Sequence, residues 1–219
     1  MRRGVLTATV LALVLAAPAA TASSAPSGAA AVAALFRGIP QHGVVLGRST
    51  APVTLVEFAD LQCPYCARWE RDVLPEIVRR YVRSGKVRLV FSGVAFLGPE
   101  SLTALRTVLA AGSQNRLWNV VELLYLNQGR ENSGWLTTSF VRRIGAAVHG
   151  LDVDAMLARR SSAAVERQRA AATTLAQAVG VYETPFFAVG LTNTSLRPLA
   201  VDALTATAIE PTLDALLRG

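Results

Sequence analysis

The feature that most constrains this chain is a Cys-Pro-Tyr-Cys run, Cys63–Cys66, which contains both of its cysteines. The run follows an apolar segment rich in β-branched residues, residues 53–59, and a helical pattern continues from Pro64 to about Ser84. An apolar run of this length is typical of a strand buried on both faces, as in a mostly parallel sheet. We therefore expect a buried strand that passes into a helix through the cysteine pair.

A second strand, residues 87–91, follows this helix and completes a strand–helix–strand unit. Such a unit forms a right-handed crossover. Pro75 lies inside the helical pattern and should kink or split the helix, because proline removes a backbone hydrogen bond. Gly85 should end the helix as a C-cap residue.

The rest of the chain predicts a block of helices followed by the remainder of a sheet. Residues 99–180 show helical periodicity and are rich in alanine, which favours helices. Residues 184–190 are typical of a strand opened by a proline, and residues 197–201 of an edge strand. Residues 202–218 predict a closing helix interrupted by Pro211. The predicted fold class is therefore α/β, a central sheet with an inserted all-helical domain.

The N-terminus has the pattern of a secretory signal peptide. Arg2 and Arg3 precede a short apolar stretch, residues 5–17, and small residues offer a cleavage site after Ala22. An uncleaved anchor is the alternative, although the stretch is short for a membrane span. The predicted organisation is a signal peptide at 1–22, a flexible lead-in at 23–32, sheet at 33–98, helical insertion at 99–180 and sheet again at 181–219.

Charge and hydropathy exclude two classes of protein. The net charge is +7, and of the 22 basic residues only Lys86 is a lysine. The arginines are scattered singly or in pairs, without the clustered basic patch that a nucleic-acid partner demands. The body of the chain has no unbroken apolar run of about 18 residues, which excludes a polytopic membrane protein.

The cysteine pair admits four explanations. A structural staple would contribute only about 2 kcal/mol for so small a loop. A zinc site needs about four ligands, and only His42 and His149 could complete one, neither with ligand-like spacing. Two inert buried thiols would be oddly placed at a helix start. A redox-active dithiol fits best, and it requires no metal or cofactor.

Elementary chemistry assigns different properties to the two thiols. Pro64 suits the first helical position, which makes Cys63 the N-cap residue. Its sulfur then faces unpaired amide N–H groups and the positive end of the helix dipole, which should lower its pKa. Cys66 lies one turn inside the helix and is the natural resolving thiol. A stabilised thiolate favours the reduced protein and makes the disulfide a stronger oxidant.

Two motifs together resemble the DsbA-like thiol-disulfide oxidoreductases of the thioredoxin superfamily. The first is Val-Glu-Phe-Ala-Asp at 56–60 leading into the Cys63–Cys66 run, and the second is Thr-Pro-Phe-Phe-Ala-Val-Gly at 184–190, with the helical block between them. Residues 39–47 and 51–53 resemble the entry to secreted bacterial members. The resemblance implies a thioredoxin-like sheet interrupted by a helical domain.

The resemblance also implies roles for five residues. Cys63 would be the attacking thiol and Cys66 the resolving thiol. Pro185 would be a cis-proline that faces the pair, and Thr184 would offer main-chain hydrogen bonds to an extended substrate peptide. Glu57, an acid within an apolar strand, should have a raised pKa and could relay a proton to or from Cys66.

Pro64 and Tyr65, between the thiols, would tune Cys63. The strongly oxidising members carry Pro-His here, so this chain lacks a neighbouring imidazole, and oxidant or reductant stays open. We expect an extracytoplasmic oxidoreductase that forms disulfides in exported cysteine-containing proteins and is reoxidised by a membrane-bound partner. A reductase or isomerase of the same fold, a secreted peptide-binding or chaperone module with a fixed disulfide, and a zinc-stabilised module are the rivals.

Overall fold

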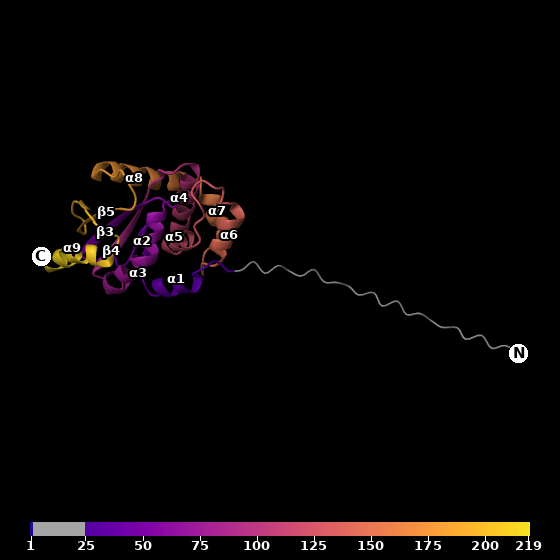
Figure 1. Ribbon diagram of the computed structural model, residues 1–219, viewed down its shortest axis with the longest axis horizontal. Coiled ribbons are helices and arrows are strands. Elements are labelled where there is room, and N and C mark those ends of the chain that lie inside the picture. The colour runs from indigo at the N-terminus through magenta and orange to yellow at the C-terminus, as the bar shows by residue number, and fades with distance from the viewer. Residues whose placement is uncertain (2–24) are drawn as a thin grey trace.

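The computed structural model describes Met1 and residues 25–219, so all but the first residue of the expected signal peptide at 1–22 lies outside the described residues. In the described part, helices surround one mixed sheet (Figure 1). No helix of that part combines the length and apolar character that a bilayer crossing requires.

The sheet has the strand order β1-β2-β4-β3-β5-β6. Only β3 and β4 run parallel, and the other neighbours are antiparallel. The expectation of a mostly parallel sheet is therefore wrong. The apolar run indicates that the strand is buried on both faces, but it does not indicate the direction of the neighbouring strands. The strands are β1 (Gln41–His42), β2 (Val45–Leu46), β3 (Val53–Ala59), β4 (Val87–Gly93), β5 (Phe186–Leu191) and β6 (Arg197–Leu199).

The helix after the cysteine run is split, as Pro75 predicted. It consists of α2 (Pro64–Asp72), α3 (Leu74–Ile77) and a π-helical turn η1 (Val78–Val82). The break lies at Val73, whose φ of −119° is far from the usual helical value of about −63°. Pro75 thereby falls in the first turn of α3, where a missing N–H leaves no hydrogen bond unmade.

Five helices stand between β4 and β5, in the place predicted for the insertion. They are α4 (Pro99–Gly112), α5 (Leu117–Leu126), α6 (Thr138–Ala146), α7 (Val153–Arg159) and α8 (Ala163–Val179). The last of them, α8, packs against β4 and covers one face of the sheet.

Both ends of the folded part differ from the sequence expectation. Helix α1 (Ala29–Phe36) begins inside the expected flexible lead-in, because Val32 and Phe36 are buried in the core. Helix α9 (Ala206–Arg218) continues through Pro211 without interruption. Burial of Ile209 and Leu213 on either side of the proline holds this helix together.

Alternation along β3 divides the core into two layers. Val56 and Phe58 point toward the layer beneath α8. Val53, Leu55 and Ala59 belong to the larger layer on the opposite face, which includes α2, α4 and α5. Glu57 shares this second face, so the sheet carries a carboxyl into the layer that contains both cysteines.

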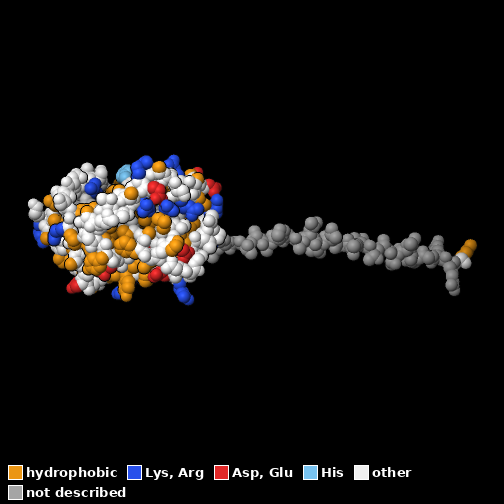
Figure 2. Space-filling model, turned by 90° about the horizontal axis from the view of Figure 1, so that it is seen from above, with side chains coloured by type: hydrophobic (Ala, Val, Ile, Leu, Met, Phe, Trp, Pro, Cys, Tyr) orange, Lys and Arg blue, Asp and Glu red, His pale blue; other side chains and the backbone are white. Residues whose placement is uncertain are grey.

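The basic residues remain dispersed in the folded protein. On the face shown in Figure 2, Lys and Arg side chains occupy several separate places among neutral and hydrophobic ones. Several arginines form ion pairs with carboxylates at the surface, such as Arg106 with Glu166 and Arg142 with Asp154. On this face the arrangement therefore agrees with the sequence, in which the arginines stand singly or in pairs.

Candidate active site

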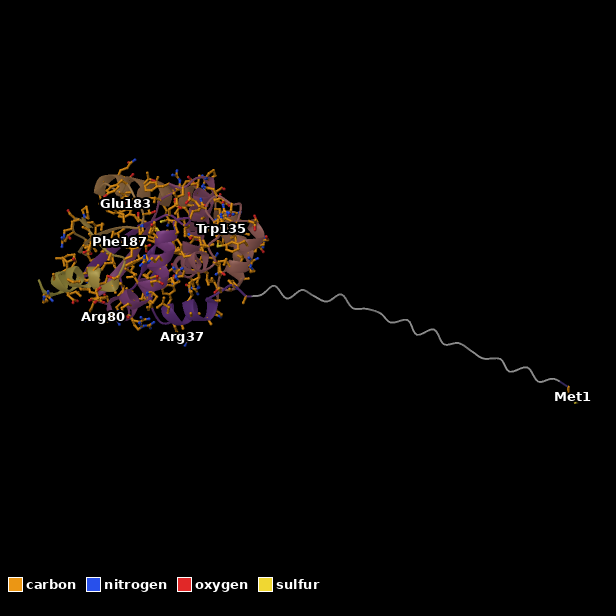
Figure 3. The ribbon with its side chains drawn as sticks, viewed as in Figure 1. Met1, Arg37, Arg80, Trp135, Glu183 and Phe187 are labelled. Atoms are coloured by element: carbon orange, nitrogen blue, oxygen red, sulfur yellow. The ribbon has the colours of Figure 1, made fainter. Side chains whose placement is uncertain are left out.

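The fold brings the two sequence motifs into contact. Antiparallel pairing of β3 with β5 sets Phe58 opposite Phe186, so the end of β3 lies beside the start of β5. The Sγ of Cys63 lies 3.3 Å from the carbonyl oxygen of Thr184, to which the thiol donates a hydrogen bond. The Thr184–Pro185 peptide bond is cis. Figure 3 shows Glu183, the preceding residue, near the end of α8, and Phe187 further along β5.

Cys63 occupies the N-cap position of α2. Its backbone is extended, Pro64 begins the helix, and its Sγ accepts a hydrogen bond from the Cys66 amide at 3.4 Å. The pKa of Cys63 is lowered to about 6. A hydrogen bond from the Cys66 thiol is the largest cause, hydrogen bonds from the Thr184 side chain and from the amides of Cys66 and Tyr65 add to it, and burial opposes it.

Cys66 has the opposite character. It has no solvent exposure, and its pKa is raised well above the ordinary value, first by burial and then by its neighbours Cys63 and Glu57. Cys63 itself is only 4% exposed, less open than the attacking thiol was expected to be. A substrate must therefore reach Cys63 through an opening at the helix start.

Such an opening adjoins Pro185. A groove of about 660 Å³ runs past the cis-proline, and Tyr65 and Tyr182 at its edge are 62% and 78% exposed. Its walls are largely apolar, with Phe186 and Leu199 from the sheet and Val201 and Leu204 beyond it. Exposed aromatic side chains beside an apolar groove are typical of a surface that binds a peptide.

Glu57 is buried in the middle of β3, 1% exposed. Its cross-strand neighbours are Phe91 and Phe187, and the ring of Trp69 packs 4.5 Å from that of Phe187. Burial in this apolar surrounding raises the pKa of Glu57 to about 8, and the charge of Cys63 contributes to the rise. Glu57 therefore holds a proton near neutral pH, next to the thiol pair.

The loop between β3 and α2 is held by groups that sequence reasoning passed over. Asp60, fully buried, accepts hydrogen bonds from the amides of Gln62, Phe96 and Leu97 at 2.9, 2.7 and 3.0 Å. Asp60 stands in the first motif, but its sequence position gave no sign of these partners.

Residues of the insertion also form hydrogen bonds with this loop. The hydroxyl of Tyr125 donates to the Asp60 carbonyl at 3.0 Å, and the Nε2 of Gln128 donates to the carbonyls of Leu61 and Cys63 at 2.9 and 3.3 Å. Two buried carboxyls, Glu70 of α2 and Glu122 of α5, lie beside Glu57. No pattern in the sequence links Tyr125, Gln128 or Glu122 to the site, because their contacts depend on how α5 docks.

Comparison with known proteins agrees with this geometry. The sequence model of one family, described as thioredoxin, matches residues 40–206 and so includes both motifs. The chain belongs to the thioredoxin family. Over 101 residues the chain is 34% identical to a probable disulfide bond formation protein D of Bacillus cereus. That alignment covers 45% of this chain and 47% of the relative, so the chain spans about half the length of the curated protein it matches.

Solved structures of the family extend the likeness over the insertion. BdbD from Bacillus subtilis superposes with a TM-score of 0.70 at 23% identity, covering 83% of this chain and 98% of that one. A thioredoxin-like oxidoreductase from Silicibacter pomeroyi gives a TM-score of 0.64 at 28% identity, covering 85% and 98%. The predicted fold class and the resemblance to DsbA-like proteins are both confirmed.

Proposed function

We propose that this chain is an extracytoplasmic thiol-disulfide oxidoreductase that forms disulfides in exported proteins through Cys63 and Cys66. The observation that carries the proposal is the position of the Cys63 sulfur, at the N-cap of α2 and 3.3 Å from the carbonyl that precedes cis-Pro185. The names of the relatives, an oxidoreductase and a disulfide bond formation protein, support the reaction class. The signal-like residues 1–22 support export.

The reaction starts from a Cys63–Cys66 disulfide. A substrate thiolate attacks the Cys63 sulfur, a substrate–Cys63 disulfide forms, and Cys66 leaves as a thiolate. Because the pKa of Cys66 is raised, this thiolate takes up a proton, which the protonated Glu57 carboxyl can supply. A second substrate thiolate then attacks the substrate sulfur and releases Cys63 as a stable thiolate. Two electrons pass from the substrate to the cysteine pair.

The Thr184 carbonyl and the groove beside it would hold the substrate during this exchange. The carbonyl accepts from the Cys63 thiol in the reduced protein. In the disulfide form Cys63 has no S–H to donate, which frees the carbonyl for a backbone N–H of an extended peptide. The apolar groove past Pro185 then takes the neighbouring side chains. A membrane-bound partner would remove the two electrons afterwards.

The test uses the oxidised protein and a reduced peptide with two cysteines. We expect one peptide disulfide to form for each Cys63–Cys66 pair reduced, no reaction with Cys63→Ser, and a trapped peptide adduct with Cys66→Ser. Equilibration with glutathione distinguishes direction: a potential less negative than about −200 mV supports the oxidase, whereas one near −270 mV would indicate a reductase. Tight peptide binding by Cys63→Ser without any turnover of the wild type would favour the chaperone alternative.

A further inference from the structure

A second pocket lies on the other side of the molecule from the substrate groove. It occupies about 370 Å³ between α1, the start of α5 and the turn after α6, and Val32, Phe36 and Leu123 are among its apolar walls. Pockets of about 300–1,000 Å³ are typical of small-ligand sites. Arg37, which lines this pocket, and Glu183, which lines the groove, are on opposite sides in Figure 3. We call it the α1–α5 pocket.

The α1–α5 pocket has a positive lining. Arg37 and Arg116 line it together with the imidazole of His149, and no aspartate or glutamate of the described residues does. Neither arginine forms an ion pair with a carboxylate in the described part of the chain. Arg116 is the N-cap residue of α5, whose first turn also has no acidic side chain. The charge of the pocket is therefore complementary to a negatively charged ligand.

Arg116 is held in a fixed orientation by the backbone. Its Nε donates to the carbonyl of His149 at 2.9 Å, and its Nη1 donates to the carbonyl of Asn115 at 3.0 Å. No described residue accepts a hydrogen bond from the third nitrogen, Nη2. A guanidinium fixed in this way can donate to a carboxylate with little further loss of side-chain freedom.

A buried amide oxygen adds a second requirement. Gln41 of β1 lines the pocket, and its Nε2 donates to the Oδ1 of Asn119 at 2.8 Å. This bond fixes the direction of the Gln41 amide and leaves its Oε1 buried, with no donor among the described residues. A buried acceptor without a partner is unfavourable. A ligand that brings an N–H group would satisfy it.

These requirements together describe one kind of ligand. It has a carboxylate for the arginines, an N–H group for Gln41 and an apolar group for the walls. The C-terminal residue of a peptide has all three, because its amide N–H, side chain and carboxylate are attached through the same Cα. A phosphate or another simple anion has no N–H and no apolar group. Capture of a C-terminal carboxylate is a recurring mode of peptide recognition.

We propose that the α1–α5 pocket binds the C-terminal residue of a peptide whose last side chain is apolar. Arg37 and Arg116 hold the carboxylate, the Oε1 of Gln41 accepts the amide N–H, and Phe36 and Leu123 pack against the side chain. This inference goes beyond the proposed function and does not depend on it, since no bond forms or breaks in the pocket. A chain end bound here leaves the groove beside Pro185 open.

The test is an NMR titration of the oxidised protein that follows the side-chain amide signals of Gln41 and Asn119. N-acetyl-leucine has all three groups, N-acetyl-leucinamide lacks the carboxylate, and isocaproate lacks the N–H. We expect N-acetyl-leucine to bind about tenfold more tightly than either, the order of one hydrogen bond to a charged or buried group.

A longer probe and a simple anion complete the titration. Acetyl-Gly-Gly-Leu should bind at least as tightly as N-acetyl-leucine, because the pocket is assigned to a chain end. Failure of this tripeptide to bind would overturn the assignment to a peptide. Equal binding of the three small probes, or displacement of N-acetyl-leucine by an equal concentration of phosphate, would show a site for simple anions and would overturn the proposal.

Two variants test the named contacts. Arg37→Gln, at an exposed position, should weaken binding of N-acetyl-leucine about fivefold, and Arg130→Gln, exposed but outside the pocket, is the matched control. Gln41→Leu should remove the preference for N-acetyl-leucine over isocaproate while isocaproate still binds. Unchanged binding in both Arg37→Gln and Gln41→Leu contradicts the proposal, and Arg37→Gln alone decides if Gln41→Leu does not fold. Both should oxidise a reduced peptide as the wild type does, so the pocket and the proposed function are tested independently.

Discussion

The two cysteines differ more in environment than their separation by one helical turn would suggest. Cys63 lies before the first turn, where amides of Tyr65 and Cys66 point at its sulfur, and its pKa is about 6. Cys66 lies inside the turn, fully buried, with the Glu57 carboxyl nearby, and its pKa is well above the ordinary value. The same side chain loses its proton readily where hydrogen-bond donors face its sulfur and keeps it where the sulfur is fully buried.

This contrast gives the disulfide exchange a direction. An incoming thiolate that attacks Cys63 displaces Cys66, and Cys63, as the thiol of lower pKa, is then the better leaving group in the second exchange. Cys66, as the thiol of higher pKa, holds its proton once reduced. The pKa of Cys63 is lowered mainly by hydrogen bonds from the Cys66 thiol and from groups near the helix start, whereas the pKa of Cys66 is raised mainly by burial, with Glu57 contributing.

The largest expected effect is the difference in alkylation between the two thiols. At pH 7 Cys63 is mostly thiolate and Cys66 almost entirely thiol, so the rates in reduced protein should differ by more than about 100-fold. Mass spectrometry after brief iodoacetamide treatment measures both sites at once. The Cys63 rate should rise through a midpoint near pH 6. Equal alkylation rates at Cys63 and Cys66 would show that the two thiols do not differ in acidity.

A second effect concerns the loop that presents Cys63. Asp60→Ala removes the acceptor of three amide hydrogen bonds inside a fully buried site. Bonds to a charged group are worth about 1.5–3 kcal/mol each, but they are not additive, so we expect a loss of about 3 kcal/mol in the free energy of unfolding. Urea denaturation of the reduced protein measures it. Asp60→Asn keeps one acceptor and should lose less, and a smaller loss for Asp60→Ala than for Asp60→Asn would contradict this role.

Asp60 also shows how far the sequence could go. The bounds of β3, Val53–Ala59, and the helix start at Pro64 could be predicted from local sequence. The strand is a run of adjacent apolar and β-branched residues, and the helix start is an N-cap residue followed directly by proline. The direction of the strands could not be predicted, since an apolar run has the same pattern in parallel and antiparallel sheets. The two-residue strands β1 and β2 are too short to show any period.

The residues of the site also fall into those that the sequence predicts and those that it does not. Cys63, Cys66, Thr184 and Pro185 were identified by their motifs, and the structure brings all four together. The hydroxyl of Tyr125 and the carboxyl of Glu122 reach the site only because α5 docks against α2. Docking depends on the apolar faces of whole helices, so neither residue stands out in the sequence. The insertion thus contributes to the site from positions that no local pattern marks.

A third effect separates the contributions of Cys63 and Glu57 through the pH dependence of stability. Cys63 has a folded pKa of about 6, below its unfolded value near 9, so its contribution is present above pH 9 and is lost as pH falls through 6. Glu57 has a folded pKa of about 8, above its unfolded value of 4.5, so its contribution is present below pH 4.5 and is lost as pH rises through 8.

The two slopes therefore oppose each other in the reduced wild type. Relative to it, Cys63→Ser should become less stable as pH rises from 6 to 9, and Glu57→Gln should become more stable, each by about 1–3 kcal/mol. Urea denaturation at closely spaced pH values measures both. If the two variants shift stability in the same direction with pH, the thiol and the carboxyl do not act as separate sources.

The smallest effect comes from the residue between the thiols. Tyr65 is exposed, so Tyr65→His should fold normally while it places an imidazole near the Cys63 sulfur. Below its own pKa that imidazole is a cation, which favours the thiolate, but solvent screens it at so exposed a position. We expect the pKa of Cys63 to fall by about half a unit and the disulfide to become slightly more oxidising. Tyr65→Phe, which removes only the hydroxyl, should change neither. If Tyr65→His leaves the Cys63 titration in place near pH 6, the side chain between the two thiols does not contribute to the acidity of Cys63.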